Sequence, residues 1–74
     1  MKNYTEWEIF CKNIRTLRER YHLSKRKMAE LLHITPKTLS LLENGTLPAH
    51  TSATVIFRLS RAFGIPPKDL FILL

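Results

Sequence analysis

The stretch that decides the fold is LSKRKMAELLHITPKTLSLLENG, residues 23–45. Its apolar spacing predicts a short amphipathic helix over residues 24–32 and a second short helix after it. The second helix has Thr35 as its N-cap and Pro36 at its first position, where a missing N–H group costs nothing. It stops at Gly45, a residue suited to a left-handed C-terminal conformation. The stretch therefore predicts two short helices joined by a tight turn.

Three cations open the first of these helices. Lys25, Arg26 and Lys27 follow Ser24, the predicted N-cap. The positive end of a helix dipole favours carboxylates instead, by roughly 0.3–1 kcal/mol each. An anion arriving from outside would remove this conflict. We therefore look for function at this helix start.

The chain has 74 residues and a net charge of +6, and we expect one domain over residues 1–74. Eight of the twelve Lys and Arg residues lie between Lys12 and Lys37, together with only two acidic residues. This segment alone accounts for the net charge. Such clustering is typical of a protein that binds a polyanion, because released counterions favour association with phosphates. The alternative is a solvated surface that only keeps the protein soluble.

Five helices and no strand are expected, so the predicted fold class is all-α. Beside the two helices above, apolar residues at steps of three and four predict a helix from about Thr5 to Tyr21, with Thr5 as N-cap. After a loop, Ser52 is expected to cap a helix that ends at Gly64. Pro66 and Pro67 then open a last short helix, KDLFILL. The predicted core-facing positions outside residues 23–45 are Trp7, Phe10, Ile14, Leu17, Tyr21, Val55, Ile56, Leu59, Ala62 and Phe63.

The chain offers little for catalysis or metal binding. Cys11 is the only cysteine, and we expect it to be a half-buried small hydrophobe rather than a redox thiol. The three histidines, His22, His33 and His50, lack the spacing of metal ligands. We therefore expect no enzyme activity, no metal and no cofactor. With no signal peptide and no apolar run near 18 residues, we expect a cytoplasmic protein with no membrane contact.

The run of residues 23–45, together with Leu17-Arg18 before it and RLSRAFGIPPKDLF after it, resembles the DNA-binding domain of the Cro and phage-repressor type helix-turn-helix proteins. The resemblance covers roughly Ile14 to Phe71. It implies a five-helix bundle with the helix-turn-helix at 24–44, whose second helix enters the DNA major groove while the first lies across the backbone. It also implies a structural salt bridge between Arg18 and Glu43. The dipole argument agrees, because a carboxylate in the last turn of a helix needs a cation beside it.

Positions on the second helix of the motif follow from 100 degrees per residue. Leu39, Leu42 and the stem of Glu43 face the core. The opposite face is the candidate surface for reading bases, through hydrogen bonds to base edges or contact with a thymine methyl group. Its members are Lys37, Ser40, Leu41 and Asn44.

Residues at the two helix starts are better placed for phosphates than for bases. For Arg26 an ion pair with Glu30 is an equal alternative. The candidates for phosphate contact are Ser24, Lys25, Arg26, Thr35 and Thr46, with His50 and Thr51 as weaker ones.

Several positions depart from the pattern of the family. His33 stands where glycine is frequent and must adopt a left-handed conformation at some strain. Pro36 and Leu41 stand where polar residues are frequent, so base discrimination is expected to be modest, or Leu41 serves a protein partner. The loop from Thr46 to Thr51 differs in length and lacks the usual cations.

The carboxyl end carries five consecutive apolar residues, which a short helix cannot all turn inward. We expect an exposed patch that mediates homodimerisation, with a palindromic operator read as two half-sites about 34 Å apart. The alternative is a tail that folds back over the first helix and covers Trp7. The expected dimer contacts are Leu70, Phe71, Leu73 and Leu74.

The combined expectation is a sequence-specific regulator of double-stranded DNA, of bacterial or phage repressor type and associated with the nucleoid. The main alternative is a protein-interaction module, such as the antitoxin half of a toxin pair, that uses Leu41 and the apolar tail. RNA binding is a more distant alternative, since no aromatic stacking platform is evident.

Overall fold

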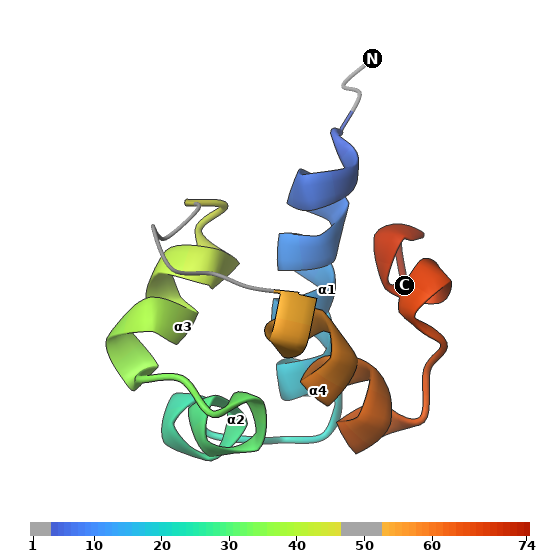
Figure 1. The fold of residues 1–74 in the computed structure, drawn as a ribbon. Coiled ribbons are helices and arrows are strands. Elements are labelled where there is room, and N and C mark those ends of the chain that lie inside the picture. Colours follow the sequence, from blue (N-terminus) through green and yellow to red (C-terminus); the bar gives the residue numbers. More distant parts are fainter. Residues whose placement is uncertain (1–3, 47–52) are drawn as a thin grey trace.

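The computed structural model describes residues 4–46 and 53–74. Figure 1 shows the elements in chain order: α1 (Glu6–Arg20), α2 (Lys25–Leu32), α3 (Pro36–Glu43), α4 (Ala53–Phe63) and the 3-10 helix η1 (Pro67–Phe71). These two ranges contain no strand, so the expected all-α class is confirmed. The predicted cap at Ser52 lies outside the described residues.

The expected count of five helices is not confirmed, because the described residues form four α-helices and the last segment forms only a single stretch of 3-10 helix. Asp69 donates its backbone N–H to the carbonyl of Pro66, and Ile72 donates to that of Asp69, both across three residues. Pro66 and Pro67 supply no N–H groups, and five residues are too few to propagate an α-helix. The chain is extended at Ile72, with φ −111° and ψ 130°, so the predicted helix over the last residues stops at Phe71.

Local signals set the starts of α1, α2 and α3 where the sequence predicts them. Thr5 caps α1, and Glu8 completes a capping box by accepting the backbone N–H of Thr5 at 3.1 Å. Ser24 caps α2 by accepting from the N–H of Lys27 at 3.0 Å. Thr35 caps α3 by accepting from the N–H of Thr38 at 3.1 Å. Each hydroxyl satisfies an N–H group that the helix itself leaves without a partner.

Left-handed residues end the first two helices. His33 has φ 57°, as expected for the turn between α2 and α3. His22, after α1, also has a positive φ of 55°, although no local sequence signal predicts it. There the N–H of Leu23 closes the end of α1 by donating to the carbonyl of Arg18 at 2.9 Å.

The core forms where α1 meets the other elements. In Figure 1, α3 and η1 lie on opposite sides of α1, with α2 and α4 completing the bundle. Two predicted core positions were wrong: Tyr21 is 56% exposed, with its ring centroid 5.2 Å from that of Phe63, and Ala62 is exposed. The buried apolar residues are Phe10, Ile14, Leu17, Met28, Ala29, Leu32, Leu39, Leu42, Val55, Leu59 and Leu70.

The carboxyl end folds back onto α1, which was the alternative to an exposed helix. Phe71 stacks on Phe10 with ring centroids 5.4 Å apart, and Phe10 in turn contacts Trp7 at 5.3 Å. Leu70 is completely buried in its own chain. Leu70 was therefore wrongly expected to be a dimer contact, because its side chain already fills the core.

A buried asparagine holds this tail in place. The amide nitrogen of Asn13 donates to the carbonyls of Leu70 and Ile72 at 2.7 and 2.9 Å, and its amide oxygen accepts from the N–H of Leu74 at 3.1 Å. Asn13 is fully buried and the tail has no helical partners for these groups. One side chain thus replaces the hydrogen bonds that a regular helix would have supplied.

Candidate nucleic-acid interface

The start of α2 presents its cations to solvent. Lys25, Arg26 and Lys27 are exposed, and the first turn of α2 contains no acidic residue. Ser24 satisfies the N–H of Lys27 by capping. The positive end of the dipole and three side-chain charges therefore coincide at one exposed point, which favours a bound anion.

Lys25 connects this point to the outer face of α3. Its Nζ donates to Oγ of Ser40 at 3.3 Å, and α2 packs directly on α3. The two residues are 15 positions apart, so the contact depends on the angle between the helices. The cationic start of α2 and the outer side of α3 therefore form one continuous surface. Sequence reasoning placed Lys25 and Ser40 in separate roles and missed their contact.

The two faces of α3 differ as the helical geometry predicts. Leu39 and Leu42 are fully buried and anchor the helix in the core. On the other side Lys37 and Asn44 are exposed, while Ser40 and Leu41 are half-buried. This outer side thus offers a cation, an amide, a hydroxyl and an aliphatic contact, which are chemical groups that can recognise base edges in a major groove.

An ion pair fixes the end of α3 against α1. The guanidinium of Arg18 binds both carboxylate oxygens of Glu43, with Nε to Oε2 at 2.7 Å and Nη2 to Oε1 at 3.1 Å. The side chains are 14% and 4% exposed. The hydrogen bond to Glu43 raises the pKa of Arg18 above its usual value. The paired geometry gives α3 a defined direction relative to α1, and Arg18 also reaches the carbonyl of Leu23 at 3.4 Å.

Glu30 lies near two of the cations of α2. Nε of Arg26 is 4.0 Å from its carboxylate and Nζ of Lys27 is 3.9 Å from it. The pair with Arg26 was one of two alternatives, and the pair with Lys27 was not anticipated. Because all three side chains are at least 59% exposed, such pairs are worth only a few tenths of a kcal/mol. They leave both cations able to turn toward an anion.

The remaining phosphate candidates differ in their surroundings. Thr35 is exposed, and its hydroxyl donates to Oγ1 of Thr38 at 2.9 Å beside its capping role. Thr46 is exposed after the end of α3, where its N–H donates to the carbonyl of Leu41 at 2.9 Å. The candidates His50 and Thr51 lie outside the described residues.

The described part of the chain offers little support for thiol chemistry or for metal binding. Cys11 is 2% exposed, more buried than expected, and desolvation with a smaller contribution from Glu8 raises its pKa to about 11. A thiol with such a pKa stays protonated and is a poor nucleophile. Residues 4–46 and 53–74 contain no group of three potential metal-ligating side chains.

Comparison with protein families matches residues 14–70 to the family described as Helix-turn-helix. The chain belongs to this family, whose Cro and phage-repressor type it resembles in sequence, and at the family level it is a DNA-binding regulator of transcription. Comparisons with curated proteins and with solved structures return no match. None of the described helices is long and apolar enough to span a membrane.

Proposed function

We propose that the chain is a repressor that binds a specific double-stranded DNA sequence through α2 and α3. The observation that supports this most is the contact between Lys25 and Ser40, which joins the cationic start of α2 to the outer side of α3. A surface of this kind suits a groove lined by phosphates, with Lys25 near the backbone and Lys37 near the bases. Lys37, Ser40, Leu41 and Asn44 are the proposed base-reading residues.

Phosphate contacts are assigned to residues at the edges of this surface. A protein that neutralises phosphates loses affinity steeply as salt rises, because bound counterions are no longer released into a dilute solution. Exposed cations and hydroxyl groups next to helix starts are the groups most used for such contacts. The proposed phosphate-binding residues are Ser24, Lys25, Arg26, Thr35 and Thr46.

Selection of bound sequences from a random duplex pool tests the proposal directly. We expect an enriched motif, and Lys37→Ala should change which bases are enriched because it removes a donor on the outer side of α3. Lys25→Ala should instead weaken all sequences alike and lower the salt slope by about 1. Lys68→Ala is the matched control, because Lys68 is exposed on η1, away from the proposed surface. This substitution should change neither the enriched bases nor the salt slope.

The alternative function is a protein-interaction module, such as the antitoxin of a toxin pair. Its support is the half-buried Leu41 on α3 and the exposed Ile72 and Leu73 at the carboxyl end. If the chain fails to bind any duplex even at low salt, DNA binding through α3 is wrong and this alternative is preferred.

A further inference from the structure

Helix α4 carries two arginines that the proposed DNA surface does not use. The helix contains Arg58 and Arg61 and no acidic residue. Arg58 is half-buried and Arg61 is exposed, and neither forms an ion pair with any residue that the structure describes. Both guanidinium groups are therefore free to pair with carboxylates that a ligand supplies.

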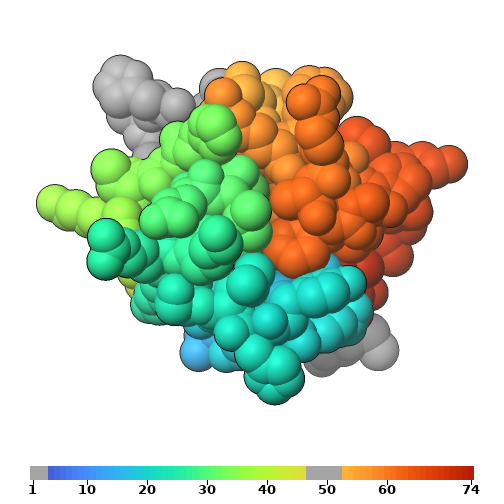
Figure 2. Space-filling model, turned by 90° about the horizontal axis from the view of Figure 1, so that it is seen from below, coloured from blue at the N-terminus to red at the C-terminus, as the bar shows by residue number. Residues whose placement is uncertain are grey.

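These arginines lie between two hollows in the surface. One hollow, of about 350 Å³, lies between α2 and α4, which are neighbours on the face seen in Figure 2. The other, of about 240 Å³, lies along α4. Among the described residues that line them there is no acidic side chain. The first is lined by Leu31, His33, Arg58, Arg61 and Ala62, and the second by Thr54, Phe57, Arg58 and Arg61.

Apolar side chains accompany the positive charge in both hollows. Phe57 lies one turn before Arg61 on α4 and is 60% exposed. The buried side of the same helix is formed by Val55 and Leu59. Leu31 is half-buried on the neighbouring helix. Aromatic residues and arginines on one exposed face are the composition typical of protein interfaces.

We propose that this face of α4 docks an acidic peptide segment of a partner protein. Arg58 and Arg61 bind its carboxylates, for which a guanidinium offers two parallel donors. Apolar side chains of the peptide pack on Phe57 and against Leu31. Charge complementarity favours this occupant, since the described residues of the face combine two arginines with apolar surface and include no acid.

The docking face lies apart from the start of α2. His33 and Leu31 are at the carboxyl end of α2, whereas Lys25 is at its first position, about 10 Å away along the axis. The proposal therefore goes beyond DNA binding and does not require it. A peptide on α4 and a duplex on α3 would use different side chains.

The experiment measures fluorescence anisotropy of a labelled synthetic peptide in which Asp and Glu surround two leucines, at physiological salt and with the full chain. The double variant Arg58→Gln with Arg61→Gln should weaken peptide binding at least about tenfold. The control, Arg20→Gln with Lys68→Gln, removes the same charge from exposed sites elsewhere and should change affinity less than about threefold. A peptide with Asn and Gln in place of its acids should not bind.

A variant of Phe57 and measurements of DNA affinity separate peptide docking from a general effect of charge. Phe57→Ser removes the apolar contact at an exposed site and should weaken peptide binding while leaving affinity for duplex DNA unchanged. The proposal is overturned if the acidic peptide does not bind, or if both double variants lose affinity equally, since the effect is then bulk charge. It is also overturned if the Arg58 and Arg61 variant loses affinity for duplex DNA rather than for peptide, because the two arginines then contact phosphates.

Discussion

At the scale of single residues, the pair of Arg18 and Glu43 and the pair of Lys25 and Ser40 differ in how far sequence predicts them. The first pair follows from the family resemblance and from the need of a carboxylate in the last turn of α3 for a nearby cation. The second depends on the packing of α2 against α3, so helical angles within α3 alone cannot reveal it. The sequence therefore predicts which side of each helix is polar better than it predicts contacts between helices.

Removing Arg18 should be costly because it leaves the carboxylate of Glu43 buried without a partner. We expect Arg18→Met to lower the free energy of unfolding by about 3–5 kcal/mol in urea denaturation followed by circular dichroism. The double variant Arg18→Met with Glu43→Leu should recover most of this loss.

The exposed pair of Arg15 and Glu19 provides the matched control. Their side chains are 3.4 Å apart and each is 59% exposed, so Arg15→Met should change stability by less than about 1 kcal/mol. Equal losses for Arg15→Met and Arg18→Met would contradict the structural role of Arg18.

At the scale of helices, the starts are better predicted than the ends. Thr5, Ser24 and Thr35 act as caps because a hydroxyl before an apolar run is a local signal. The left-handed turn at His22 has no such signal, since neither glycine nor asparagine stands there. The last segment fails as an α-helix because two prolines and a short length limit it to 3-10 geometry.

The two left-handed histidines lead to a prediction about glycine. His33→Gly and His22→Gly should each raise the free energy of unfolding by up to about 1 kcal/mol, because a side chain at positive φ is strained and glycine is not. Thermal unfolding of the single variants measures the effect. His33→Val should be destabilising, and a loss of stability on either glycine substitution would show that the histidine side chain contributes more than its backbone strain costs.

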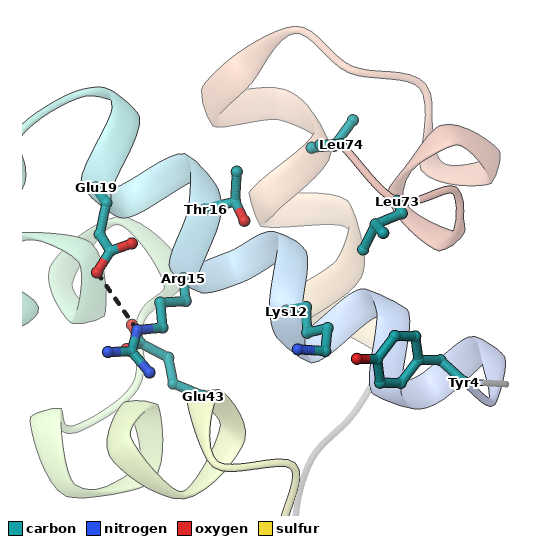
Figure 3. A pocket seen from close by; sticks show the side chains of 8 residues that line it. All are labelled: Tyr4, Lys12, Arg15, Thr16, Glu19, Glu43, Leu73 and Leu74. Carbon is teal, nitrogen blue, oxygen red and sulfur yellow. Dashed lines mark hydrogen bonds and ion pairs between the residues drawn. The ribbon is translucent and has the colours of Figure 1, made fainter. Parts of the chain in front are cut away.

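At the scale of the whole molecule, the carboxyl end serves the fold first. Leu70 and Phe71 belong to the core side of the tail, while Ile72, Leu73 and Leu74 are exposed. Leu73 and Leu74 line a hollow of about 350 Å³, and in Figure 3 Leu73 lies on the side of Tyr4 and Lys12 while Leu74 lies closer to Thr16. The sequence could not divide the apolar run between core and surface, because the division depends on the hydrogen bonds to Asn13.

The exposed part of the tail remains the proposed site of homodimerisation. In sedimentation equilibrium at micromolar concentration, the wild-type chain should have twice the mass of the 8.7 kDa chain, and Leu73→Asp should reduce it to the monomer. Phe57→Asp, at a comparably exposed site on α4, should leave the dimer intact. A monomeric wild-type protein would contradict this interface.

The link between Arg18 and Glu43 also bears on how the molecule opens. The two residues are 25 positions apart in the chain, and their ion pair joins α1 to the last turn of α3. Opening that turn alone would leave Arg18, whose side chain is 14% exposed, without its carboxylate partner, so the amide protons of the turn should exchange with solvent more slowly than those of other helix ends. The helix proposed to enter the groove would then be held rigid before DNA arrives, and binding would require little further ordering of its backbone.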